Sequence, residues 1–175
     1  MIPAILLLGG APGSGKSTVA RLFANRAAVV EVDDLRGELH RIPSAAALTS
    51  SEVHHVALAQ AATIALAFLS RGERQVVVVD TFGLSAFHAF FRALRGRAVV
   101  KSVSLVVDLG EHARRLETRP EVPGVFRDLE AARKVDAEHH LNRMTERIDT
   151  TRLTPGDVAA RILSNMFHTT NEESA

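Results

Sequence analysis

Short apolar runs alternate with longer segments of helical periodicity along most of the chain. The apolar runs are rich in leucine, isoleucine and valine, which is typical of strands that are buried on both faces of a sheet. These runs predict strands at Ile5–Leu8, Val29–Val32, Val76–Val79 and Val103–Val107, with a weaker fifth strand at Arg147–Asp149. The periodic segments predict helices at Lys16–Arg26, Glu52–Ser70, Ser85–Leu94, Glu111–Arg119, Asp128–Met144 and Pro155–Phe167.

This alternation predicts an α/β fold, because a helix between two strands returns the chain for parallel pairing through a right-handed crossover. The expected architecture is a three-layer α/β/α sandwich with about five parallel strands. The last helix has a clear start, with Thr154 as N-cap, Pro155 in the first turn and Asp157 three residues after the cap. We expect one domain over residues 1–167, followed by a polar tail at 168–175.

Composition narrows the classes of function. The 175 residues include 21 basic and 20 acidic side chains, so the net charge of +1 gives no sign of a strongly basic nucleic-acid arm. The chain has no cysteine, which excludes disulfides, thiolate metal sites and cysteine nucleophiles. It also has neither tryptophan nor tyrosine, so a binding surface built on aromatic stacking is not expected.

No segment has the pattern of a targeting or membrane-spanning sequence. Met1–Leu8 is apolar but lacks a basic start and runs into glycines after eight residues. Val56–Leu69 contains Gln60 and Thr63 and is too short to span a bilayer. We therefore expect a soluble, cytoplasmic protein with no membrane partner.

A glycine-rich segment between the first strand and the first helix carries the strongest functional pattern. It fits G-x-x-x-x-G-K-[ST], the P-loop or Walker A motif, with Thr18 following the motif: Gly10, Ala11, Pro12, Gly13, Ser14, Gly15, Lys16 and Ser17. The glycines let successive backbone N–H groups point into one concavity, and the helix that follows adds the positive end of its dipole. Lys16 would contact the β- and γ-phosphates, and the Ser17 hydroxyl would hold Mg²⁺. The segment predicts a nucleoside triphosphate site.

Asp80 ends the third strand after four consecutive valines, which indicates a central strand beside the one that leads into the P-loop. A carboxylate at this place can bind Mg²⁺ or the waters around the ion, although an aspartate that only ends a strand would look the same. Residues 80–83 also fit the D-x-x-G pattern of GTPases. Because the chain has no N-K-x-D segment to recognise guanine, the GTPase class is not favoured.

The segment Asp33-Asp34-Leu35-Arg36 follows the second strand, 17 residues after Lys16. Ligands of parallel α/β sheets collect at the carboxyl ends of the strands, so this segment faces the same crevice as the phosphates. A carboxylate there can accept the proton of an attacking hydroxyl, and Arg36 can neutralise phosphate charge. An aspartate that caps an ordinary surface helix would explain the same residues.

Together, the GAPGSGKST loop, the DDLR segment and the VVVVDTF strand resemble P-loop kinases of the polynucleotide kinase and zeta-toxin group, often described as AAA-type ATP-binding proteins. The resemblance covers essentially the whole chain in the order of its elements, but three short motifs carry it. It implies the strand order 2-3-1-4-5, ATP as the nucleotide and Mg²⁺ as its metal. It also implies that Asp33 is the general base and that Arg36 binds the acceptor.

The same group has a lid with arginines after the fourth strand, and Arg115 and Arg119 match it in place and spacing. Independently, these two arginines share a helical face at i, i+4 and precede a stretch with prolines and a glycine, which predicts a mobile loop at residues 115–127. Arginines on a closing lid can clamp a transferring phosphoryl group. A solvated helix face would also explain them, and Arg127 or Arg133 could supply the charge instead.

One position departs from the pattern of this group. Its members often have asparagine two residues after the third-strand aspartate, where this chain has Phe82, which puts acceptor contacts from this turn in question. Phe82 and the phenylalanines at positions 87, 90 and 91 are expected to pack between helices, and one or two of them could line the acceptor pocket. The pairs His54-His55 and His139-His140 are expected at the surface or an interface, because adjacent histidines on a helix point about 100° apart and rarely share an ion.

The leading interpretation is a Mg²⁺-dependent kinase that transfers the γ-phosphoryl group of ATP to a hydroxyl of a small molecule, a nucleotide or a nucleic-acid 5′ end. The near-neutral charge favours a small acceptor over a long polynucleotide. A regulatory ATPase or switch with a protein partner is the alternative from another class. A third reading is a nucleotide monophosphate or metabolite kinase, such as a gluconate or shikimate type, with an acceptor pocket at Asp33–Arg41 and Glu52–Ser70. The choice of ATP over GTP rests on the resemblance alone.

Overall fold

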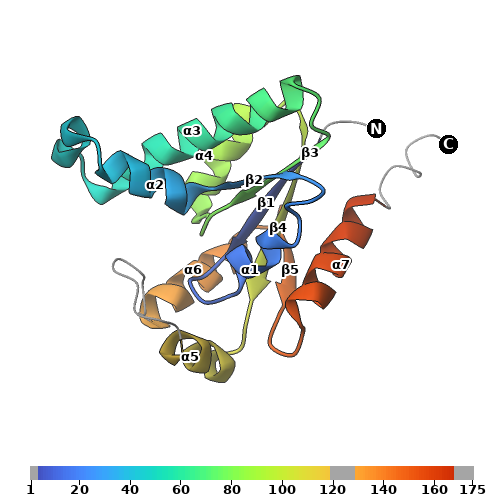
Figure 1. Cartoon of the computed structure of the whole chain (residues 1–175). Coiled ribbons are helices and arrows are strands. Elements are labelled where there is room, and N and C mark those ends of the chain that lie inside the picture. The colour runs from blue at the N-terminus through green and yellow to red at the C-terminus, as the bar shows by residue number, and fades with distance from the viewer. Residues whose placement is uncertain (1–3, 119–128, 168–175) are drawn as a thin grey trace.

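In the part of the chain that the computed structural model describes, residues 4–118 and 129–167, five parallel strands form one sheet in the order β2–β3–β1–β4–β5 (Figure 1). The strands are β1 (Ala4–Gly10), β2 (Ala28–Glu31), β3 (Gln75–Val79), β4 (Val99–Val106) and β5 (Glu146–Asp149). The helices are α1 (Lys16–Arg21), α2 (Val32–His40), α3 (Ser50–Ser70), α4 (Leu84–Leu94), α5 (Leu109–Glu117), α6 (Leu129–Leu141) and α7 (Pro155–Phe167), with a 3₁₀ helix at Pro43–Ala47. The predicted fold class and strand order are confirmed.

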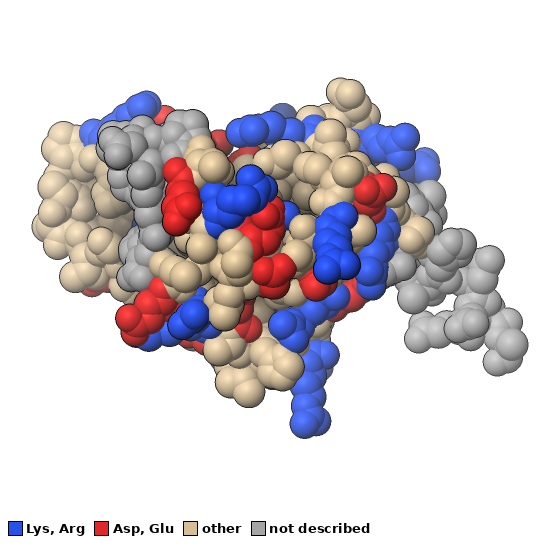
Figure 2. Space-filling view, turned by 90° about the horizontal axis from the view of Figure 1, so that it is seen from below, with Lys and Arg blue, Asp and Glu red and all other residues tan. Residues whose placement is uncertain are grey.

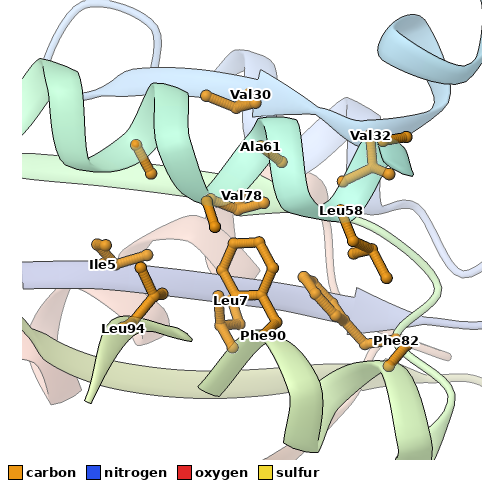
Figure 3. Close-up of a cluster of buried hydrophobic side chains, with 14 of the residues drawn as sticks. Ile5, Leu7, Val30, Val32, Leu58, Ala61, Val78, Phe82, Phe90 and Leu94 are labelled. Carbon is orange, nitrogen blue, oxygen red and sulfur yellow. The ribbon is translucent and has the colours of Figure 1, made fainter. Parts of the chain in front are cut away.

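Alternate side chains of β1 enter two hydrophobic cores on opposite faces of the sheet. Ile5 and Leu7 are fully buried in the core that α3 and α4 cover, where Phe90 also packs (Figure 3). Leu6 and Leu8 are fully buried in the second core, which α1 and α7 cover. Figure 1 shows the two helical layers on either side of the sheet. Burial on both faces explains why the central strands are continuously apolar.

Helix α2 was not among the predicted helices, although a surface helix that starts at an aspartate was the alternative explanation of this segment. The second strand ends at Glu31, and Val32, which was expected to end that strand, is the first residue of α2. Asp33 and Asp34 lie in the first turn of α2, where carboxylates interact favourably with the positive end of the helix dipole. Leu39 is buried, and α2 packs against α3. The predicted acceptor motif is therefore held on a helix whose apolar side is anchored.

Two helices begin with reciprocal caps. In α3, the Thr49 hydroxyl accepts from the Glu52 N–H at 3.3 Å, while the Thr49 N–H donates to the Glu52 carboxylate at 2.7 Å. In α7, Thr154 and Asp157 form the same exchange at 3.2 and 3.0 Å, which confirms the predicted start. Several boundaries differ from the prediction. Helix α3 begins at Ser50 rather than Glu52, and α1 gives way to turns after Arg21. Strand β4 begins at Val99 rather than Val103, and α6 ends at Leu141 rather than Met144.

By length and composition alone, α3 could cross a membrane, since it is apolar and has 21 residues. This corrects the expectation that the segment is too short. In the structure, α3 instead lies along the sheet beside α4, and its buried residues face the core: Val53, Ala57, Leu58, Ala61, Ala62 and Ala65. The small alanine side chains let the helix approach the strands closely, as in the central helix of a packed α/β domain.

The turn after β3 contains a strained backbone position. Phe82 has a φ of +49°, in the left-handed region that side chains with a Cβ rarely adopt. Its ring is 3% exposed and packs edge to face on Phe90, with ring centroids 5.7 Å apart. Asparagine would tolerate this conformation better than phenylalanine does. In this chain the position serves the core.

The strain at Phe82 predicts that glycine is a more stable replacement than alanine at this position, the reverse of the order in a helix. Phe82→Gly should be more stable than Phe82→Ala by about 1 kcal/mol, because only glycine is relaxed at a positive φ. At Phe90, inside α4, alanine should be the more stable replacement by about 1 kcal/mol, as in ordinary helices. Urea unfolding of the four variants measures both differences. Equal preference for alanine at both positions would show that Phe82 is not strained.

Candidate active site

Three glycines shape the P-loop between β1 and α1. Gly10, Gly13 and Gly15 have φ values of +138°, +88° and +99°, which glycine adopts without strain. A Cβ at Gly10 would lie 2.5 Å from the Leu105 carbonyl oxygen, so packing also requires glycine there. A Cβ at Gly15 would meet none of the described atoms within 4 Å. The loop is therefore packed against the protein at Gly10 and open at Gly15, where the cradle faces outward.

The groups that should contact phosphate lie at this open side. Gly15 is the N-cap of α1 and supplies no side-chain cap, so the first N–H groups of the helix remain for a ligand. The Lys16 ammonium donates to the Ala11 carbonyl at 3.0 Å, which folds the side chain back over the loop. The Ser17 hydroxyl donates to the Glu31 carboxylate at 2.8 Å. These contacts place the predicted phosphate and metal ligands around one cradle.

Buried polar groups hold the P-loop from behind. His112 of α5 is fully buried, and its Nε2 lies 2.6 Å from the Pro12 carbonyl oxygen. The Thr150 hydroxyl, just after β5, lies 3.1 Å from the Val106 carbonyl and 3.4 Å from that of Ser14. Both partners come from segments far from the loop in sequence. They fix the shape of the cradle before a nucleotide binds.

Asp33 and Arg36 of α2 form an ion pair one helical turn apart, with 3.0 Å between Oδ1 and Nη1. The Asp33 side chain is 73% exposed, so its carboxylate is open to an acceptor from the solvent side. The Arg36 side chain is 31% exposed, and its Nε is buried without a hydrogen-bond partner among the described residues. Arg36 is thus held against the protein with donor capacity left for a ligand.

Asp80 is nearly fully buried at the end of β3. Burial raises the pKa of Asp80, and the negative charge of Asp33 raises it further, while the charge of His54 and the N–H groups of Thr81 and Phe82 act to lower it. Asp80 follows β3 and Asp33 lies in the first turn after β2, so both acidic groups belong to the segments that leave the carboxyl ends of two neighbouring strands. This placement is the one expected from the sheet topology.

Arg115 is not part of a loop, as the predicted lid would require. It lies in α5, where it donates to Glu111 at 2.8 Å and to the hydroxyl and carbonyl of Thr150 at 3.1 and 2.9 Å. Hydrogen bonds from Arg114 and Arg115 lower the pKa of Glu111 to about 2. Thr150 also contacts the P-loop at Ser14, so it connects Arg115 to the cradle. Arg119, and the part of the predicted lid after it, lie outside the described residues.

Both histidine pairs were expected at the surface or an interface, and this is wrong for His139. His139 is 4% exposed, and its Nε2 lies 2.6 Å from the Thr81 carbonyl oxygen, while His140 is exposed. Burial lowers the pKa of His139, which favours a neutral ring that donates to Thr81. His54 is half-buried, with Nε2 3.4 Å from the Asp80 carboxylate, while His55 is exposed. His54 and His139 therefore both contact the segment after β3.

Two site residues were missed in the sequence. Glu31 accepts a hydrogen bond from the P-loop residue Ser17 and lies two residues before Asp33, but it was considered only as part of a strand. His54 was considered only as half of a possible metal-binding pair. The acid at the carboxyl end of a predicted parallel strand was a usable signal for Glu31. No sequence signal linked His54 to Asp80, because the two lie on different elements.

The residues present fit a nucleotide with Mg²⁺. Mg²⁺ is usually held by one or two protein oxygens together with substrate phosphates, rather than by a complete protein cage. Across residues 4–118 and 129–167, no group of three or more histidine, aspartate or glutamate side chains forms a metal site. Ser17 and Glu31 place oxygen atoms beside the cradle, and Asp80 ends β3, the strand next to the one that leads into the P-loop. The donor set therefore suits a metal ion that arrives with phosphate.

Fold and site together define a P-loop α/β protein of the kinase type. The family described as "AAA domain" matches residues 6–136, and the chain belongs to this family. The resemblance to P-loop kinases in the sequence motifs is thereby confirmed. None of the curated proteins matches the sequence.

Solved structures show the same fold. The tunicamycin resistance protein of Deinococcus radiodurans is 19% identical, with a TM-score of 0.71 over 94% of this chain and 96% of that one. A chain of the Pnkp1/Rnl/Hen1 RNA repair complex is 23% identical, with a TM-score of 0.65 over 81% of this chain and 45% of the other. The shikimate kinase of Acinetobacter baumannii, in complex with shikimate, is 20% identical, with a TM-score of 0.58 over 98% and 97%.

The open cradle at Gly15 gives a testable contrast. Gly15→Ala should lower the affinity for ATP by about tenfold, the equivalent of one lost hydrogen bond of ~1.4 kcal/mol, because the methyl group would occupy the cradle. Gly72→Ala is the matched control. Gly72 has a φ of +101° and equally open surroundings, but it lies between α3 and the start of β3, at the opposite end of the strands from the P-loop. Both variants should lose about 1–2 kcal/mol of stability. Equal ATP affinity in the two variants would contradict a phosphate site at Gly15.

Proposed function

We propose that the protein is a kinase that transfers the γ-phosphoryl group of ATP to a hydroxyl of a small molecule. The observation that carries the proposal is the meeting of three segments at one edge of the sheet: the P-loop, the first turn of α2 and the end of β3. The first supplies phosphate ligands, the second an exposed carboxylate at Asp33, and the third a buried carboxylate at Asp80. This combination would provide a donor site, a base and a metal site at the carboxyl ends of neighbouring strands.

In this proposal each residue has a defined role. The loop amides and Lys16 bind the β- and γ-phosphates, with Lys16 released from the Ala11 carbonyl. Ser17 and Asp80 would hold Mg²⁺, with Glu31 beside Ser17, and the ion would neutralise phosphate charge. The acceptor oxygen attacks phosphorus as its proton passes to the Asp33 carboxylate.

The bond between phosphorus and the β–γ bridging oxygen breaks as the new bond forms, and ADP leaves with that electron pair. Arg36 would stabilise the charge on the moving phosphoryl group from the acceptor side. Arg115 and Arg119 would do so from the α5 side. For Arg115 this requires an exchange of its Thr150 contacts for phosphate oxygens.

Two observations support a small acceptor rather than a long nucleic acid. On the face in Figure 2, the described basic and acidic side chains are intermingled, whereas a nucleic-acid groove needs a continuous basic surface. The matches to the tunicamycin resistance protein and to shikimate kinase cover most of this chain and most of the other chain. The RNA repair chain is more than twice as long as the part that this protein matches.

We place the protein in the cytoplasm, where ATP and Mg²⁺ are available.

The proposal predicts transfer that depends on one of two adjacent aspartates. With γ-labelled ATP and Mg²⁺, label should move to one pool among sugars and sugar acids, nucleosides and nucleotides, antibiotics with free hydroxyls, and 5′-hydroxyl oligonucleotides. Asp33→Asn should reduce transfer by about 10²–10⁴ and leave ATP affinity nearly unchanged, because it removes only the base. Asp34→Asn, one residue along the same turn, is the control and should retain most activity.

Other outcomes identify other functions. Transfer to oligonucleotides alone would replace the small acceptor with a nucleic-acid end. Release of inorganic phosphate at a rate that none of the acceptor pools changes would favour a regulatory ATPase. In that case the exposed Asp33 carboxylate would accept the proton of an attacking water molecule. Equal transfer by wild type and Asp33→Asn would exclude Asp33 as the base.

A further inference from the structure

Two groups lie against the same oxygen of the Asp80 carboxylate. The Phe82 N–H donates to Oδ2 at 3.3 Å, and His54 Nε2 lies 3.4 Å from that atom, within ion-pair distance. The first group belongs to the strained turn after β3, and the second comes from α3, 26 residues earlier in the chain. Contacts from two different segments restrict the position of this oxygen.

His54 is itself held in place by its helix. It lies in the second turn of α3, just after the reciprocal cap of Thr49 and Glu52. Its neighbours Val53 and Ala57 are buried against the sheet and prevent this turn from shifting. His54 Nδ1 is buried and has no hydrogen-bond partner in the described part of the chain, so Nε2 is the nitrogen that interacts with protein. The ring therefore approaches Asp80 from one fixed direction.

The side chains available at this turn make His54 the polar partner of Asp80. Phe82 turns its apolar ring into the core and offers Asp80 no polar side chain. Thr81 is engaged through its carbonyl by His139. The turn thus contributes backbone N–H groups to Asp80, and the side-chain contact comes from α3. This helix also borders α2, which carries Asp33.

We propose that His54 is a positioning residue that orients the Asp80 carboxylate for the Mg²⁺ bound with the nucleotide, and so links α3 to the phosphate site. The inference rests on the proposed function, since it assumes that Asp80 faces the metal. It predicts that the side chain at position 54 changes the Mg²⁺ requirement of nucleotide binding while contacting neither the metal nor the phosphates. Outer partners of metal ligands typically alter metal affinity by 10–100-fold when they are replaced.

The test is the Mg²⁺ dependence of binding of a non-hydrolysable ATP analogue, measured by calorimetry over a series of Mg²⁺ concentrations. In His54→Phe, the Mg²⁺ concentration for half-maximal enhancement should rise by about tenfold or more. Affinity for the analogue without Mg²⁺ should stay at the wild-type value, because the P-loop is unchanged. His54→Gln should recover part of the loss, since its amide can still donate to Asp80.

Exposed His55 provides the matched control, and His55→Phe should behave as wild type in every measurement. Thermal unfolding of all variants separates positioning from loss of fold, and His54→Ala replaces His54→Phe if the larger ring is not accommodated. A wild-type Mg²⁺ dependence in both of these His54 variants would overturn the inference while leaving the proposed function intact. Failure of the wild-type protein to bind the analogue would instead overturn the proposed function, and this inference with it.

Discussion

The register of the three strands β2, β3 and β1 is the constraint on which the site depends. Leu8 of β1 and Glu31 of β2 both pair with Val79 of β3, so β2 and β3 end at the same level, and β1 continues for Gly9 and Gly10 beside β4. The Asp80 N–H donates to the Leu8 carbonyl at 3.3 Å at this point. The segments after β2 and β3 therefore leave the sheet together, close to the start of the P-loop. The P-loop, α2 and the Asp80 turn begin side by side because a continuous apolar core holds the strands in this register.

Much of this arrangement follows from local sequence. Continuous apolar runs are typical of strands buried on both faces, and the spacing of the P-loop motif left little choice for the segment between β1 and α1. Asp80 and the Asp33 motif could be placed at the carboxyl edge because parallel topology brings all strand ends there. Thr154 and Asp157 identified the start of α7 through a purely local exchange of hydrogen bonds.

What the sequence could not predict depends on contacts between distant segments. Helix α2 begins at once after β2, and Val32 fits a strand or a helix equally well until its burial is known. The partners of Asp80 come from α3, and the support of the P-loop comes from His112 and Thr150. Arg115 had the correct spacing for a lid, but its role in the structure is set by Thr150, 35 residues away.

In the proposed function the cradle binds the phosphates of ATP, and the surrounding side chains exchange their present partners for the nucleotide and its metal. A crystal structure with Mg²⁺ and a non-hydrolysable ATP analogue tests this most directly. We predict the β- and γ-phosphates on the loop amides, Lys16 moved from the Ala11 carbonyl to phosphate oxygens, and the Ser17 hydroxyl moved from Glu31 to the metal. An analogue bound elsewhere, or phosphates in the loop with Lys16 still on Ala11, would contradict it.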